Sequence, residues 1–343
     1  MAFRRHTQTA QTAYHDLVSL LLDDAVSDLH GAPASRLING KTYWYDRYRI
    51  GTRIHERYLG EETPDLLSRL ENHNKLKEAR ALRRQERARI VRLLRSERFL
   101  GLDGATGSLL AALARTGTFR LGGTLVGTAA FRLYEGELGL RLSMDQLAMT
   151  NDIDIASFER LSLALNDKVE PSLQQVLGGF EFEPITTLDR NKVWRWRQSA
   201  TQTMVEFLTP SFEDAEGIRN LPALGVSARS LHFMNYLIAE PVAAAGVYRE
   251  GILVQIPRPE RFAIHKLIVS SRRKDGPDSL KARKDLLQAE LLIDVLAEDR
   301  PLDLEEAYHD AMSRGPRWRE LITQSLTRSK AASQRIASLA PGG

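Results

Sequence analysis

Two aspartates near the middle of the chain have a spacing that suits metal chemistry. Asp152 and Asp154 alternate with Ile153 and Ile155 in the segment TNDIDI, residues 150–155. In a β-strand successive side chains point to opposite faces, so both carboxylates share one face and both isoleucines share the other. Neighbouring carboxylates repel each other unless a cation lies between them, and Mg²⁺ or Mn²⁺ prefers such oxygen ligands. The pair indicates a divalent-metal site, although a solvated turn can also carry two aspartates.

A glycine turn precedes these aspartates by about 25 residues. Residues 119–126 resemble a strand interrupted by glycine, Gly127 follows, and Thr128 opens an apolar helical segment. Glycine lets the backbone approach a ligand closely, and the free N–H groups of a helix N-terminus suit phosphate. Gly127 and Thr128 are therefore candidate phosphate-binding residues. An ordinary tight turn with Thr128 as the N-cap is the alternative.

A third acid, Glu206, lies in the second strand of an expected hairpin. Residues 192–208 alternate as two strands around a polar turn. A buried carboxylate is unfavourable unless it has a partner. A metal shared with the two aspartates would be such a partner, and so would Arg195 or Arg197 across the hairpin.

In this order, the glycine turn, the Asp-x-Asp strand and the later acid resemble the polymerase-β-like nucleotidyltransferase superfamily. The likeness is greatest to a bacterial group described mainly as nucleotidyltransferase-fold proteins, and it extends over about residues 40–310. The shared segments are LVGTAAF (125–131) with Tyr134, LGLRL (138–142), TNDID (150–154) and PERFAIHKL (259–267). The resemblance implies an α/β (α+β) core with a mixed sheet, in which Asp152, Asp154 and Glu206 are the catalytic metal ligands. The superfamily more often has Asp at the third position.

The C-terminal part is similar to abortive-infection and toxin nucleotidyltransferases, which carry a Lys and then an Asp on C-terminal helices. The matching residues are Lys266 and Asp285. The resemblance implies that both belong to the nucleotide site, where Lys266 would act as a compact positive charge on the phosphates. Two simpler interpretations stay open, namely that Lys266 lies on a solvated helix face and that Asp285 pairs with Lys281 at i,i+4.

The composition is that of a globular protein without disulfides. The chain has 343 residues, 43% of them hydrophobic and 27% charged, which is enough for two or three domains. It contains no cysteine, so disulfides and thiolate metal sites are excluded. No apolar run is long enough to span a membrane, and the first residues lack the apolar core of a signal peptide. We therefore expect a cytoplasmic protein without a membrane partner.

We expect four regions along the chain. Residues 1–100 should form a helical N-terminal region with a small β-hairpin and a basic helix. Residues 117–212 should form the nucleotidyltransferase core, and residues 225–327 a mainly helical C-terminal domain. The Ser- and Ala-rich residues 328–343 should form a flexible tail.

Two N-terminal segments have features of nucleic-acid binding. Residues 75–98 hold ten lysines and arginines against three acids, so a helix here could follow an RNA backbone or serve as a solvated connector. Residues 41–60 interleave aromatic residues with arginines, as in base-stacking surfaces. The candidate RNA contacts are Tyr43, Tyr45, Arg47 and Arg49. A small hairpin that packs its rings on a neighbouring helix is the favoured interpretation.

Together these features predict metal-dependent transfer of NMP from an NTP, such as ATP, to an acceptor hydroxyl, with release of pyrophosphate. An RNA 3′ end, tRNA especially, is the favoured acceptor because of the basic segments and the toxin-like pattern, which also raises a toxin–antitoxin or defence role. A protein hydroxyl and a small molecule such as an antibiotic are alternatives. A catalytically silent binding or antitoxin module is the alternative of a different class.

Overall fold

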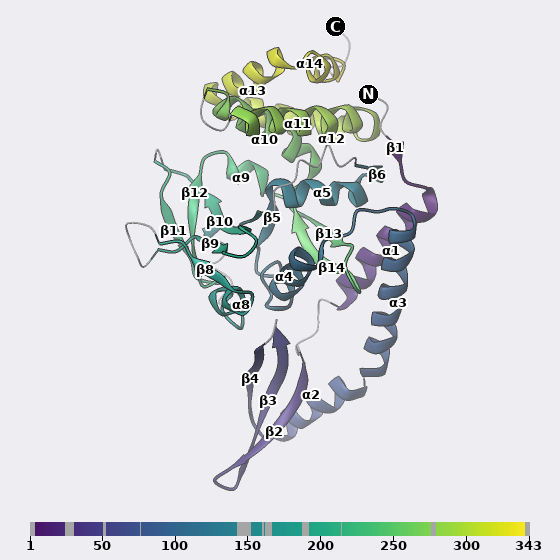
Figure 1. Cartoon of the computed structure of the whole chain (residues 1–343), viewed down its shortest axis with the longest axis vertical. Coiled ribbons are helices and arrows are strands. Elements are labelled where there is room, and N and C mark those ends of the chain that lie inside the picture. The colour runs from purple at the N-terminus through teal and green to yellow at the C-terminus, as the bar shows by residue number, and fades with distance from the viewer. Residues whose placement is uncertain are drawn as a thin grey trace.

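The computed structural model of the chain describes residues 4–24, 31–50, 53–75, 77–142, 152–159, 161, 167–186, 192–213, 215–275 and 279–339. Figure 1 shows a central mixed sheet, a layer of C-terminal helices above it, two long helices along one side and a three-stranded sheet that projects from the far end. The structure thus has the mixed α/β architecture predicted from the sequence.

The strands are β1 (Arg4–Arg5), β2 (Ala32–Ile38), β3 (Lys41–Ile50), β4 (Arg53–Glu61), β5 (Thr124–Val126), β6 (Leu140–Arg141), β7 (Ile153–Ala156), β8 (Phe182–Pro184), β9 (Arg195–Gln198), β10 (Met204–Pro210), β11 (Ile218–Leu221), β12 (Val226–Leu231), β13 (Val242–Gly246) and β14 (Ile252–Ile256). The helices are α1 (Gln8–Asp24), α2 (Pro64–Lys75), α3 (Lys77–Ser96), α4 (Gly104–Arg115), α5 (Gly127–Glu137), α8 (Leu173–Gly179), α9 (Met234–Leu237), α10 (Pro259–Arg273), α11 (Ser279–Asp299), α12 (Pro301–Ser313), α13 (Pro316–Arg328) and α14 (Lys330–Ala337).

The central sheet brings three short segments of the sequence side by side. Strand β7 pairs antiparallel with β5 on one edge and parallel with β10 on the other. The far edge of β10 is shared, because β9 pairs with its beginning and β12 with its end. Strands β8 and β11 then extend the sheet through β9 and β12. This topology places the start of α5 and the aspartates of β7 next to the hairpin that carries Glu206.

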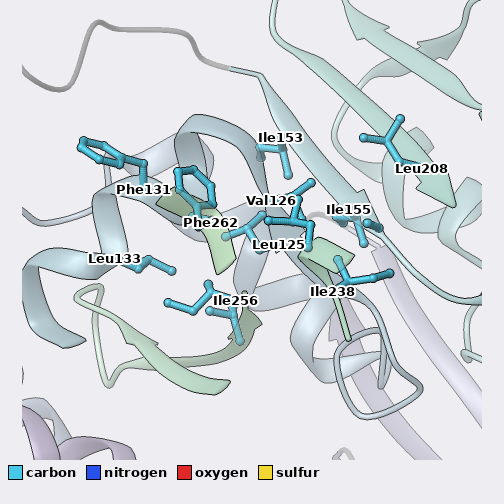
Figure 2. Close-up of a cluster of buried hydrophobic side chains, with 14 of the residues drawn as sticks. Leu125, Val126, Phe131, Leu133, Ile153, Ile155, Leu208, Ile238, Ile256 and Phe262 are labelled. Carbon is cyan, nitrogen blue, oxygen red and sulfur yellow. The ribbon is translucent and has the colours of Figure 1, made fainter. Parts of the chain in front are cut away.

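The sheet is fixed by an apolar core on the face opposite the carboxylates. Ile153 and Ile155 are at most 1% exposed, as the alternation in the sequence predicts. Figure 2 shows them with Leu125, Phe131 and Phe262, which come from β5, α5 and α10. The rings of Phe131 and Phe262 are 6.2 Å apart between centroids. Helix α10 is therefore anchored to the sheet by the same core that holds the strands.

The C-terminal helices form a layer over α5 and the sheet (Figure 1). Proline opens α10, α12 and α13, where its missing N–H leaves no helical hydrogen bond unmade. Helix α10 packs along α11 and is covered on other sides by α12 and α13. Lys266 of α10 and Asp285 of α11 therefore lie on helices that are packed against several others.

The N-terminal helices form a second, smaller core along the side of the molecule. Helices α1 and α3 pack together and against the hairpin β13–β14, with Leu17, Leu94 and Val247 buried between them. The hydroxyl of Tyr14 accepts a hydrogen bond from the backbone N–H of Ala245 at 3.1 Å. These contacts attach the N-terminal region firmly to the central part of the chain.

The remaining sheet, β2–β3–β4, is antiparallel and extends from the molecule beside α2 (Figure 1). We call it the arm. Its inner face holds Asp46, which is fully buried, and Tyr48, which is 9% exposed and belongs to the main core. The sequence predicted a hairpin here, and the structure adds β2 as a third strand.

Several boundaries differ from those expected. The central sheet continues past residue 212 through β11 and β12, because β12 pairs with the end of β10. The basic stretch 75–98 is divided between the end of α2 and α3. The expected flexible tail over 328–343 is wrong for residues 330–337, which form α14. Its Ile336 is 7% exposed and its Arg335 pairs with Asp294 at 2.7 Å.

Among the described residues, no helix is long and apolar enough to cross a membrane.

Candidate active site

The carboxylates predicted from the sequence lie where strands β7 and β10 pair. Asp154 in β7 lies directly opposite Glu206 in β10 in the parallel register. Opposite residues of paired strands share a face, so both side chains point away from the apolar core. Asp152 precedes β7 by one residue, while Thr150 and Asn151 of the same motif lie outside the described residues. The structure thus brings two of the three acids into register, with the third two residues away.

Burial and mutual repulsion perturb this group strongly. Burial, followed by the negative charges of Glu206 and Asp152, raises the pKa of Asp154 to about 7. The pKa of Glu206 is raised as well, mainly by burial, and Asp152 adds to it while Arg195 opposes it. Asp154 therefore senses both Glu206 and Asp152, and Glu206 senses Asp152, so the charged forms of Asp154 and Glu206 are disfavoured in the absence of a cation.

Glu206 has a cationic partner across the hairpin. The Nε atom of Arg195 in β9 lies 2.7 Å from Oε1 of Glu206, and the two residues are in register. The Arg195 guanidinium also stacks on the ring of Trp194, at 4.3 Å from the ring centroid. Of the partners that the sequence left open, Arg195 is the one observed.

Gly127 is in direct contact with the aspartate site. It has a φ of +65° and begins α5 immediately after β5. A Cβ atom at this position would lie 2.3 Å from Oδ2 of Asp154, so the carboxylate occupies the space that any other side chain would need. The alternative in which Thr128 is the N-cap is wrong, because the N-cap is Val126 and makes no side-chain cap hydrogen bond.

Thr128 instead connects the glycine turn to the C-terminal helices. Its hydroxyl accepts a hydrogen bond at 2.9 Å from Nζ of Lys284 in α11. Burial, and after it the positive charge of Lys266, lowers the pKa of Lys284, whereas Asp285 and Asp152 oppose that shift. Lys284 therefore lies close to both the aspartates and the Lys266 helix. Nothing in the sequence singles out Lys284 except its place next to Asp285.

Lys266 and Asp285 form a buried ion pair between α10 and α11. Nζ of Lys266 is 2.5 Å from Oδ1 of Asp285, and the two side chains are 10% and 3% exposed. The second oxygen of Asp285 accepts a hydrogen bond from Arg273 at 2.7 Å. Although burial alone raises the pKa of Asp285, Lys266 and Arg273 hold it below its usual value. Asp285 thus orients two cations, and both of them lower the pKa of Asp154 through space.

His265, the neighbour of Lys266, faces the interior. Burial and the nearby positive charge of Lys266 lower its pKa to about 3. A neutral, buried imidazole in this position serves as a packing residue.

The donor set fits a divalent cation. Asp154 and Glu206 are oxygen ligands whose pKa values are raised mainly by burial, and Mg²⁺ or Mn²⁺ would add positive charge that favours their ionised forms. No three His, Asp or Glu side chains within the described part of the chain are already grouped to hold a metal ion. The Arg195–Glu206 pair explains this, since Glu206 is engaged by a cation of the protein.

The arginines of the basic stretch mainly hold the N-terminal region together. Arg83 and Arg87 in α3 both pair with Asp24 at the end of α1, and Arg87 is only 7% exposed. Arg84 pairs with Glu250 at 3.3 Å. These contacts favour the connector interpretation for Arg83 and Arg87, which pair with Asp24, whereas the Arg84 side chain stays 68% exposed beside Glu250.

The comparison with protein families agrees with the fold and the site. A family model described as Nucleotidyltransferase matches residues 104–313, which is more than half of the chain and includes every residue of the site described above. The chain therefore belongs to the nucleotidyltransferase family, whose members are NMP-transfer enzymes. No curated protein and no solved structure shows significant similarity to it.

Proposed function

We propose that this nucleotidyltransferase uses Asp152, Asp154 and Glu206, with a divalent cation, to transfer NMP from an NTP to a 3′ hydroxyl of RNA. The observation that carries the proposal is the register of Asp154 with Glu206, next to a glycine whose missing side chain makes room for the aspartate. Neighbouring acids with raised pKa values, as at Asp154 and Glu206, are unfavourable without a cation, and they are typical of a metal-dependent phosphoryl-transfer site.

The acids would have distinct tasks. Asp152 and Asp154 would hold Mg²⁺ or Mn²⁺, and Glu206 would share the catalytic ion. When bound, the metal supplies Lewis-acid stabilisation of the charge that develops on the phosphate oxygens. Asp154 and Glu206 both have raised pKa values, which suits a group that accepts the proton of the acceptor hydroxyl.

The triphosphate would lie between the glycine turn and the C-terminal helices. Gly127 and Thr128 begin α5, so their backbone N–H groups have no hydrogen-bond partner within the helix. Lys284 already donates to Thr128, and Lys266 lies close to it. Two lysines opposite the acids would neutralise the phosphates from the side away from the metal. Asp285 would position Lys266 and Arg273 and would not touch the nucleotide itself.

The choice of RNA as acceptor rests on two features. The buried pair Lys266–Asp285 is consistent with the resemblance to abortive-infection and toxin nucleotidyltransferases, and the chain is mildly basic, with a net charge of +4. These features support an RNA 3′ end, with tRNA as the leading case, and a toxin or defence role like that of the toxin nucleotidyltransferases that the C-terminal part resembles.

Labelled nucleotides test the proposal. The purified protein is incubated with Mg²⁺ and each α-³²P-labelled NTP, in parallel with total tRNA, with RNA-free lysate protein and with an aminoglycoside mixture. Label on RNA, lost with Asp154→Asn, is the expected result. Label on protein or on a small molecule would replace the RNA acceptor while keeping the enzyme. Absence of label in every reaction would favour a catalytically silent module.

A further inference from the structure

The arm has one face that packs on the molecule and one face that does not. Registers Arg36–Tyr43 and Tyr45–Tyr58 place these four residues on a single face, which we call the outer face. Tyr58 is 56% exposed, whereas Asp46 and Tyr48 of the inner face are buried. The outer face is therefore available to a partner.

Three tyrosines form a continuous aromatic surface there. The ring centroids of Tyr45 and Tyr58 are 5.6 Å apart, and those of Tyr43 and Tyr58 are 6.2 Å apart. The guanidinium of Arg36 lies 5.1 Å from the centre of the Tyr45 ring. These three rings contact one another across the strands. A tiled surface of rings presents π-faces on which flat ligands stack.

The same face carries an excess of positive charge. Its alternating positions hold Lys41, Arg47 and Arg49 in β3 and Arg36 in β2. Opposed to these four cations are two carboxylates of β4, Glu56 and Glu61. Arg36 pairs with Glu56 at 2.6 Å and Lys41 with Glu61 at 2.9 Å. Such exposed ion pairs contribute little free energy, so a phosphate group could replace the carboxylate partner of Arg36 or Lys41 with little loss.

We propose that the outer face of the arm binds the unpaired nucleotides of an RNA acceptor. Bases would stack on Tyr43, Tyr45 and Tyr58, while Arg36 and Arg49 would contact the backbone phosphates. Stacking on aromatic rings requires bases that are not already paired and stacked, which is the condition of a single-stranded 3′ end. An acidic protein partner would account for the positive charge, but it would not account for the row of three tyrosine rings on the same face.

The position of the arm in the sequence agrees with this role. The arm lies before residue 104, where the family match begins. The transfer site is complete without it, so the arm is free to serve acceptor recognition. This inference rests on the proposed transfer to RNA, and it adds the surface that would select single-stranded acceptors.

Fluorescence anisotropy with a fluorescein-labelled, mixed-sequence 12-nucleotide RNA tests the inference without NTP or metal. We expect the wild type to bind this strand more tightly than the same strand annealed to its complement. Tyr58→Ala should weaken binding about fivefold or more, and Tyr58→Phe should stay within about twofold of the wild type because it keeps the ring. Arg49→Gln should lower the slope of log affinity against log salt by about 0.7. The control variant Arg317→Glu changes a residue of α13, outside the arm, and should leave RNA binding unchanged.

Three outcomes would overturn the inference. The first is unchanged RNA binding by the Tyr43, Tyr45 and Tyr58 triple alanine variant. The second is equal binding of single-stranded and duplex RNA. The third is a wild-type dimer that Tyr58→Ala converts to a monomer, with no RNA binding by either, which would make the outer face a protein interface. Asp154→Asn should bind RNA normally, so loss of NMP transfer and loss of RNA binding are separate results.

Discussion

Replacing Gly127 with alanine tests how closely the glycine turn and the aspartate site depend on each other. The new Cβ would meet Oδ2 of Asp154 at 2.3 Å, with the Asp154 Cγ at 3.4 Å. An ordinary contact needs more than 3 Å, so either the carboxylate or the start of α5 must move by about 1 Å. Displacements of about 1 Å in a catalytic group cost on the order of 100-fold in rate. We therefore expect Gly127→Ala to lower kcat by about that factor.

The stability effect of the same change is predicted to be small. A non-glycine residue with left-handed φ costs about 1–2 kcal/mol, and the stiffer unfolded chain returns about 0.4–1 kcal/mol of this. The net loss from backbone strain is about 1 kcal/mol. Gly225 provides a matched control, because it has the same φ of +65° and nothing within 4 Å of its missing Cβ.

Transfer kinetics and thermal unfolding of both variants separate the two effects. Gly225→Ala should lose about 1 kcal/mol of stability and keep its kcat. Gly127→Ala should lose at least as much stability and most of its kcat. If both variants transfer NMP at the wild-type rate, Gly127 is only a turn residue, and its contact with Asp154 has no role in catalysis.

Three further changes probe the surroundings of the acids. Lys284→Ala should weaken NTP binding about tenfold more than NMP binding in equilibrium titrations, because it removes a charge from the β- and γ-phosphates; equal losses would assign Lys284 a structural role. Arg195→Ala should tighten Mn²⁺ binding by the nucleotide-free protein, measured by electron paramagnetic resonance, because it releases Glu206; weaker binding would contradict this. His265 has a folded-state pKa of about 3, below its unfolded value, so the unfolded state binds more protons as the pH falls below about 6.5. Its share of the stability should then fall by up to about 1.4 kcal/mol per pH unit in urea unfolding, and His265→Leu should show a shallower slope than the wild type; an unchanged slope would refute the assignment.

Local patterns in the sequence were enough to predict the acidic half of the site. The strand before Gly127, the alternation around Asp154 and the hairpin of Glu206 each depend on neighbours within a few residues. The periodicity of apolar residues and the positions of glycines indicate such local structure directly. The family resemblance implied that the three acids share a site, but the parallel pairing that sets Asp154 beside Glu206 was not predicted, since no local signal encodes it.

The basic half of the site depends on contacts that are distant in the sequence. Lys284 meets Thr128 across 156 residues, and a helical position alone does not show which neighbour a lysine will face. The same reason applies to Arg87, whose partner Asp24 lies 63 residues away and turns an apparent RNA-binding residue into a link between helices. Strand β2, with the weak β-formers of APASRLI, forms because β3 offers it a full edge.

The most direct test of the central claim is NMP transfer by Asp152→Asn and Asp154→Asn, measured beside thermal unfolding in EDTA. Asparagine keeps the shape of each side chain and removes its negative charge. The account predicts at least about a 100-fold loss of transfer in both variants. It also predicts an unfolding temperature equal to or above that of the wild type, because repulsion with Glu206 is relieved. Undiminished transfer by either variant at saturating Mg²⁺ would show that these aspartates do not form the catalytic metal site.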